Sequence, residues 1–167
     1  MLCPPLRFFV FLGACLLATP AHAHLPLETS VRVTPTAEAL ELAVTVAEPT
    51  ARSLLDPSPT TQLQTANFSD HRPGLLAAAP SLCTLLDSAD RPIAPLQTLV
   101  SLNSEGEVTY LLLYPPDPLP AALRSAFLDT SSAPGRFVSL LDSTRSPAGR
   151  AVLVRAHSTY HFAPASP

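Results

Sequence analysis

Histidine is the residue type in this chain that is best suited to binding a metal. Four histidines, His24, His71, His157 and His161, follow residue 23. If the chain is cut after Ala23, His24 becomes the first residue and offers its amine and imidazole nitrogens together. Such a chelating pair suits Cu(II). The pattern therefore suggests a copper or nickel site built from His24 with one or two of the other histidines.

The pair His157 and His161 has the spacing of a metal site only on a helix. The surrounding Val152, Val154 and Tyr160 favour a strand. Four residues of a strand span about 13 Å, whereas two imidazoles on one ion need nitrogens ~2 Å from it. We therefore expect these two histidines to lie on a solvated face rather than to share a metal.

Two further features could support catalysis, namely Cys83 and the pair Asp70 and His71. The run around Cys83 is apolar, which predicts a small buried side chain. No nucleophile elbow, C-x-x-C or H-E-x-x-H motif accompanies Asp70 and His71. We expect a protein that is not an enzyme. A thiol chemistry would require Cys83 to be exposed near His71 or His157.

Residues 1–23 have the three parts of a secretory signal peptide. Arg7 precedes an apolar run over 8–18, and Ala21 and Ala23 form a small-residue cleavage site. The run is well short of the roughly 20 residues that a transmembrane helix needs. The protein is therefore expected in the periplasm or the medium, with no transmembrane segment in the mature chain. A lipid anchor on Cys15, within Leu-Gly-Ala-Cys, is the minor alternative.

Composition limits the classes of partner. The chain has 167 residues, 10 basic and 13 acidic residues and a formal net charge of −3. Without a basic cluster it lacks the electrostatic footprint of nucleic-acid binding. Removal of residues 1–23 would leave Cys83 as the one cysteine, so no internal disulfide is expected. The fold must then depend on its hydrophobic core.

Apolar residues recur mostly at every second position, which is typical of strands. The clearest case is 40–46, where Leu40, Leu42, Val44 and Val46 share one face, and 30–33 should pair with it as a hairpin. Further strands are expected over 82–86, 96–102, 107–114, 136–142 and 152–162. The strand over 107–114 is apolar on both faces near its middle, so it should be covered on both sides.

One short helix is expected over 121–128. Prolines interrupt 48–80, which should be irregular except for short helical turns at 50–55 or 75–79. About seven strands with one short helix predict a mainly β fold, an immunoglobulin-like antiparallel β-sandwich over 24–162, followed by a disordered tail at 163–167.

The start of the expected mature chain and the block 108–142 together resemble a known family. The residues concerned are His24 to Val33, the strand over 40–46, Tyr114-Pro115-Pro116 and Phe-Val-Ser-Leu-Leu-Asp at 137–142. They resemble the extracytoplasmic N-terminal domain of HupE/UreJ-type hydrogenase/urease accessory membrane proteins. The resemblance implies a β-rich exported domain that works with a membrane permease. We expect no membrane segment after this domain, so the resemblance does not imply transport itself.

An exported β-sandwich that begins with histidine also resembles periplasmic copper-resistance carriers, although their C-terminal Asp/Gly/His signature is missing here. The leading hypothesis is therefore an exported, non-enzymatic binding or interaction module with a protein partner, accessory to a membrane protein such as a permease. The alternative is a periplasmic copper or nickel carrier that uses His24.

Overall fold

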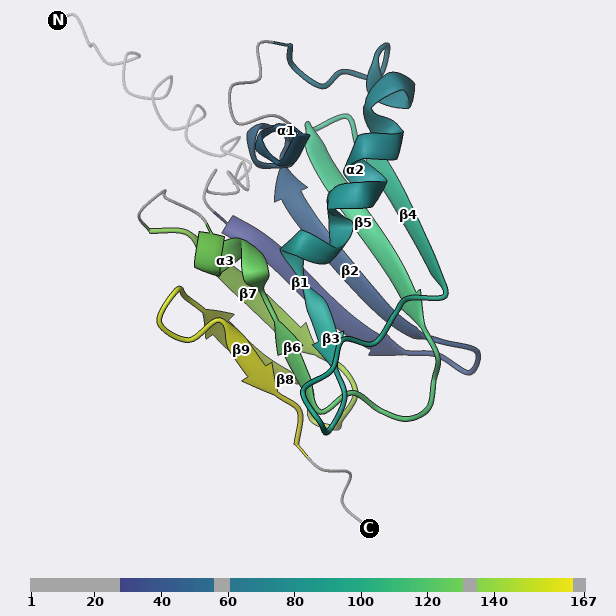
Figure 1. Ribbon diagram of the computed structural model, residues 1–167, viewed down its shortest axis with the longest axis vertical. Helices are drawn as coiled ribbons and strands as arrows, with labels where there is room; N and C mark the ends of the chain where they lie inside the picture. The colour runs from purple at the N-terminus through teal and green to yellow at the C-terminus, as the bar shows by residue number, and fades with distance from the viewer. Residues whose placement is uncertain (1–27, 56–60, 131–134, 164–167) are drawn as a thin grey trace, which may run out of the picture.

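The computed structural model describes residues 28–55, 61–130 and 135–163 (Figure 1). The expected signal peptide, Cys15, His24 and residues 164–167 of the expected tail lie outside these ranges. Among the described residues, none of the helices has both the length and the hydropathy to cross a bilayer.

Six strands form the larger of two sheets. Their spatial order is β4-β5-β2-β1-β7-β8, and every neighbouring pair is antiparallel except β1 and β7, which are parallel. The expected hairpin is confirmed, because Val31 of β1 lies opposite Val44 of β2. The strands are β1 (Glu28–Pro35), β2 (Leu40–Ala47), β4 (Gln97–Leu102), β5 (Glu107–Tyr114), β7 (Phe137–Asp142) and β8 (Gly149–Leu153).

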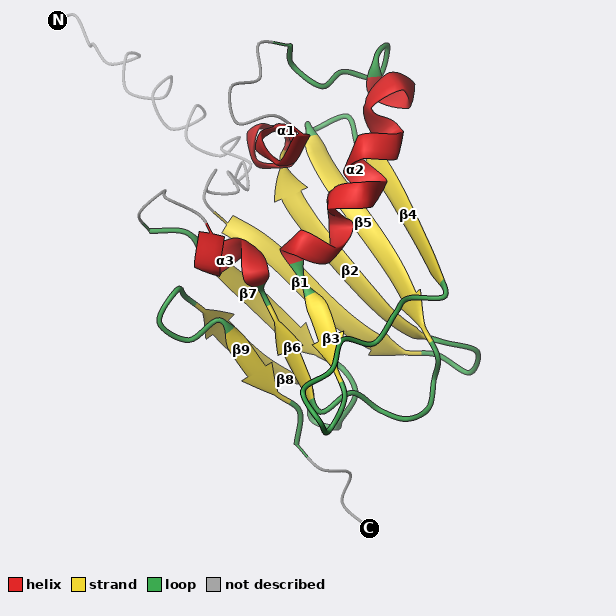
Figure 2. Ribbon diagram, in the orientation of Figure 1, coloured by secondary structure: helices red, strands yellow, loops and turns green. Residues whose placement is uncertain are grey.

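A second layer of short strands and helices covers one face of this sheet. Figure 2 shows the helices and the smaller sheet on the same side of the larger one. The smaller sheet has the order β3-β6-β9, from β3 (Thr84–Leu86), β6 (Ala122–Arg124) and β9 (Thr159–His161). The helices are α1 (Glu48–Leu55), α2 (Phe68–Leu82) and α3 (Ala126–Thr130).

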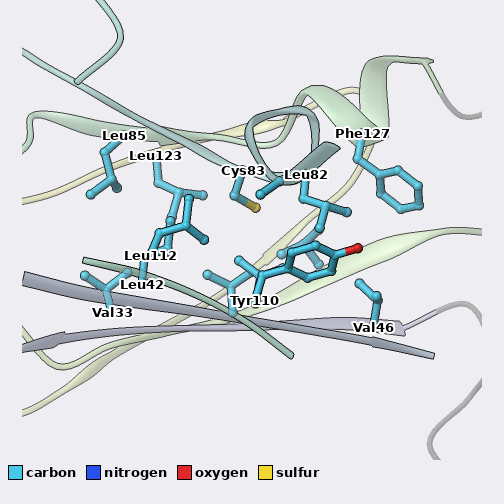
Figure 3. Close-up of a cluster of buried hydrophobic side chains, with 14 of the residues drawn as sticks. Val33, Leu42, Val46, Leu82, Cys83, Leu85, Tyr110, Leu112, Leu123 and Phe127 are labelled. Atoms are coloured by element: carbon cyan, nitrogen blue, oxygen red, sulfur yellow. The ribbon is translucent and has the colours of Figure 1, made fainter. Parts of the chain in front are cut away.

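The core lies between the two layers. In Figure 3, Val33, Leu42 and Leu112 of the larger sheet face Leu85 and Leu123 of the smaller one. All five side chains are almost completely buried. Because alternate residues of each strand of the larger sheet point to this side, the period of two in the sequence is what builds the core.

The expected β class is confirmed, and several finer expectations need correction. The described residues form nine strands and three helices rather than about seven strands and one helix. The larger sheet is not wholly antiparallel, since β1 and β7 run in the same direction. These strands come from opposite ends of the chain, so no short turn forces them to be antiparallel.

The segment 48–80, expected to be irregular except for short helical turns at 50–55 or 75–79, contains all of α1 and most of α2, so its helices are longer than expected. Helix α2 runs through Pro73 and Pro80. Both prolines are exposed, whereas Leu75, Ala79 and Leu82 of the same helix are buried at spacings of three to four residues. Burial of this apolar stripe stabilises the helix despite the backbone donors that the prolines lack.

The helix expected over 121–128 is also wrong in its first half. Residues 122–124 form β6, which pairs with both β3 and β9 through Leu123, and only 126–130 are helical. The strand expected over 152–162 is likewise divided into β8 and β9, which belong to different sheets. In each case pairing with distant strands decides the local structure, because it provides hydrogen-bond partners for the backbone N–H and C=O groups of these short segments.

Strand β5 is central but covered on one side only. Tyr110 and Leu112 point into the core and are buried, whereas Leu111 and Leu113 on the other side are partly exposed. This corrects the expectation of cover on both faces. The larger sheet therefore presents a face that no described helix or strand covers, which we call the outer face.

Candidate functional site

The outer face is hollowed into a groove of about 640 Å³. Its floor is formed by side chains of β2, β1, β7 and β8, and we call it the outer-face groove. Volumes of this size are usual for ligand sites in proteins. The residues that line it are Ser30, Val31, Arg32, Ala43, Thr45, Ser139, Leu140, Leu141, Arg150, Ala151 and Val152.

Two arginines stand in one row across the groove. Arg32 of β1 lies opposite Leu141 of β7, and Leu141 lies opposite Arg150 of β8. The Cα atoms of the arginines are thus two strand spacings apart, or about 10 Å. The parallel pairing of β1 with β7 brings the two guanidinium groups to the same hollow.

A row of hydroxyl groups runs beside the arginines. Ser30 lies opposite both Thr45 and Ser139, and Thr45 lies opposite Thr109. The Oγ1 atoms of Thr45 and Thr109 are 3.0 Å apart and hydrogen-bonded. Along each strand this row is two residues, about 6.7 Å, from the row of the arginines. The groove thus combines cationic donors with neutral donors and acceptors.

Arg32 and Arg150 are exposed, and in the described part of the chain neither guanidinium has a hydrogen bond or an ion pair. Other arginines are matched: Arg91 pairs with Asp87 at 2.8 Å, and Arg124 pairs with Asp129 at 2.9 Å. Among the described residues that line the groove there is no Asp or Glu. It is therefore a local cationic site on a chain whose formal net charge is −3.

A second cavity of about 390 Å³ lies at one end of the β2–β5 pair and has Asp87, Arg91 and Tyr114 in its lining. Here Arg91 is already paired with Asp87, at 2.8 Å, and Asp117 adds a second carboxylate to the lining. Hydrogen bonds from the backbone and side chain of Arg91 lower the pKa of the Asp87 carboxyl. Because the one arginine in its lining is paired with Asp87, this cavity offers an acidic ligand less than the outer-face groove does.

Cys83 lies in the core, and its expected burial is confirmed. Burial raises the pKa of the Cys83 thiol from 9.0 to about 12, although a hydrogen bond with Ser125 opposes the rise. The thiol therefore stays protonated at neutral pH. The condition for thiol chemistry, an exposed Cys83 beside His71 or His157, is not met in this conformation.

The histidines that the structure describes are spread over different elements. His71 lies on α2 and is partly exposed, His157 lies in the turn between β8 and β9, and His161 lies on β9, the last two exposed. Within the described ranges, no three His, Cys, Asp or Glu side chains form a group that could hold a metal. His24, the residue on which the carrier hypothesis depends, is outside those ranges.

Asp70 and His71 show no catalytic pairing. Asp70 is exposed, and its carboxylate accepts a hydrogen bond from the Ser69 hydroxyl at 3.4 Å. Sequence reasoning singled out these residues and missed Arg32 and Arg150. Their alternation with buried neighbours places Arg32 on the outer face, but nothing local to either arginine indicates that the two are close.

Comparison with known proteins gives no family. None of the protein-family models matches this chain, and none of the curated proteins does. The resemblance to HupE/UreJ-type accessory proteins therefore stays a prediction from the sequence.

Proposed function

We propose that this protein is an exported, non-enzymatic β-sandwich module that binds a protein partner and acts as an accessory to a membrane protein such as a permease. One observation carries the proposal, namely the uncovered outer face with its groove. A sheet face that is hollow, partly apolar and provided with unpaired arginines is suited to binding.

The apolar part of this face supports a macromolecular partner. Val152 in the groove is 63% exposed and Leu99 of β4 is 37% exposed, and Leu111 and Leu141 between them are partly exposed. These side chains come from separate strands of one sheet. Covering them would remove apolar area from water, which favours association by about 25 cal/mol per Å² before the costs of binding.

The scaffold of the proposed module is an immunoglobulin-like β-sandwich. Two sheets that enclose one core support this description, with α1 and α2 occupying much of the second layer beside the small sheet. Loops and faces of such sandwiches commonly serve as binding surfaces on a rigid frame.

Site-specific photocrosslinking in the producing cell tests the function. A photoreactive amino acid replaces Val152 in the groove, and as a control it replaces Leu119, which is 49% exposed in the loop between β5 and β6. We expect Val152 to give one discrete protein adduct and Leu119 to give none. Mass spectrometry of the adduct then shows whether the partner is a membrane protein. Equal adducts at both positions, or none at Val152, would contradict the proposal.

The carrier hypothesis rests on a different observation, the cleavage site that would leave His24 as the amino terminus. In this proposal the terminal amine and imidazole hold Cu(II) or Ni(II). Titration of the exported protein with Cu(II), followed by visible absorption, should show a d–d band that is lost in His24→Ala. An identical band in both proteins would eliminate His24 as a ligand.

A further inference from the structure

We infer that the outer-face groove binds an extended, carboxylate-bearing segment of a protein partner, with Arg32 and Arg150 as the two anchoring residues. This inference rests on the proposed function, to which it adds the chemistry of the partner. It starts from two guanidinium groups that share one groove and have no partner among the described residues.

The chemistry of the guanidinium group indicates an acidic ligand. Its planar fork donates two parallel hydrogen bonds to one carboxylate, and such charge-assisted bonds are shorter and stronger than neutral ones. Arginines elsewhere on this chain form that kind of contact: the Nε atom of Arg91 donates to the carboxylate of Asp87 at 2.8 Å. In the groove, Arg32 and Arg150 have the same capacity, and the described lining contains no acid that pairs with them.

Charge also selects the partner. The chain as a whole carries a formal charge of −3 and should repel acidic proteins. The outer-face groove is an exception, because two cations line it and none of its described lining residues is Asp or Glu. An acidic segment would therefore bind in the outer-face groove, and the net negative charge would disfavour its binding to other parts of the surface.

The spacing and the apolar lining of the groove fit an extended peptide chain. The two arginine Cα atoms are about 10 Å apart with Leu141 between them, so a ligand that spans both strands also passes over Leu141. Ala43, Leu141 and Val152 offer apolar contact at the same place. In an extended peptide, side chains on one face repeat about every 6.7 Å. Acidic and apolar side chains of one segment can then reach the arginines and the aliphatic lining together.

The hydroxyl row provides neutral partners for the rest of such a segment. Ser30, Thr45 and Ser139 border the arginine row along the groove. Serine and threonine hydroxyls both donate and accept hydrogen bonds, so they can serve a peptide's amide groups in either direction. The arginines would thus select a negatively charged ligand. The hydroxyls would bind its backbone amide groups whatever its other side chains are.

Peptide binding to the exported, purified protein tests the inference. The probe is a fluorescein-labelled peptide in which valine and glutamate alternate for eight residues, and its twin has glutamine in place of each glutamate. Fluorescence anisotropy measures both. We expect Arg32→Gln and Arg150→Gln each to weaken binding of the glutamate peptide by about 10- to 100-fold, the range expected for a hydrogen bond to a charged group. Affinity should also fall as salt rises.

Arg72→Gln is the matched control, because Arg72 is exposed on α2 away from the groove and its loss changes the net charge equally. It should leave affinity within about twofold, as expected for screened charges at a distance. Urea midpoints of all three variants should equal that of the parent protein, which separates lost binding from lost folding.

Any of three results in the peptide-binding assay would overturn the inference: equal affinity for the glutamate and glutamine peptides, equal weakening by Arg72→Gln, or competition by free glutarate at the concentration at which the peptide itself binds. The last result would assign the groove to a small dicarboxylate. The photocrosslink from Val152 distinguishes failure of the proposed function from failure of the inferred acidic partner. An adduct that persists in Arg32→Gln/Arg150→Gln would preserve the proposed function and reject the acidic partner, whereas the absence of any adduct would reject the function itself.

Discussion

Removal of the buried thiol should change how stability depends on pH. Cys83 is 1% exposed, and burial raises its pKa from 9.0 in the unfolded chain to about 12 in the fold. A group whose pKa is raised by folding stabilises the fold fully below the unfolded pKa, and this contribution is lost as pH rises through the folded pKa. The folded protein should therefore lose stability between pH 9 and about pH 12. Cys83→Ala lacks this loss.

The size of the effect follows from the two pKa values. One pH unit of separation corresponds to about 1.4 kcal/mol, so the thiol's contribution falls by about that amount for each unit above pH 9 and by about 4 kcal/mol by pH 12. At pH 7, Cys83→Ala should cost about 1 to 2 kcal/mol, because a small cavity replaces the sulfur atom. The two proteins should therefore be equally stable near pH 10, and the alanine variant should be the more stable above it.

Urea unfolding followed by circular dichroism, with a reductant present and at half-unit steps from pH 7 to pH 10.5, measures this crossing. Burial also raises the pKa of Tyr110 and that of Tyr114, which reaches about 12. Both tyrosines remain in the variant, but the charge of an ionised Cys83 also raises the pKa of Tyr114. The difference between the two proteins therefore reports the thiol together with its effect on Tyr114. A difference in free energy of unfolding that stays constant from pH 8 to pH 10.5 would refute the reasoning and would mean that the thiol ionises in the fold as it does in solution.

Three further predictions concern the frame that carries the groove, and urea midpoints measure each. Leu112→Ala should cost about 2 to 5 kcal/mol, whereas Leu111→Ala on the outer face should cost about 1 kcal/mol or less; equal costs would mean that β5 is covered on both sides. Asp142→Asn should cost about 1.5 to 3 kcal/mol, because the buried carboxylate accepts a hydrogen bond from the Tyr160 hydroxyl at 2.9 Å; in a Tyr160→Phe background the cost should shrink. Gly106→Ala should cost about 1 to 2 kcal/mol because its φ of +79° suits only glycine well, and an unchanged midpoint would contradict this.

Prediction from the sequence succeeded where the local pattern and the tertiary contacts agree. The alternation over 40–46 indicated both a strand and the face that Leu42 and Val44 bury, and both are confirmed. Prediction failed where distant contacts outweigh local signals. Pro73 and Pro80 argued against a helix, yet α2 forms because its leucines close the core over β5 and β4. The segment 122–124 has a helical spacing of apolar residues, but pairing on both edges makes it a strand.

The outer-face groove, too, could be predicted from the sequence only in part. The sequence by itself determined which side chains share a face, because a strand turns successive residues to opposite sides: Ser30 and Arg32 had to point away from Val31 and Val33. Only the tertiary structure decided which strands are neighbours. The parallel pairing of β1 with β7 brings Arg32 beside Leu141 and within reach of Arg150, although these residues are far apart in the chain. Side-chain alternation is a property of a few consecutive residues, whereas strand order depends on the free energy of the whole packed core.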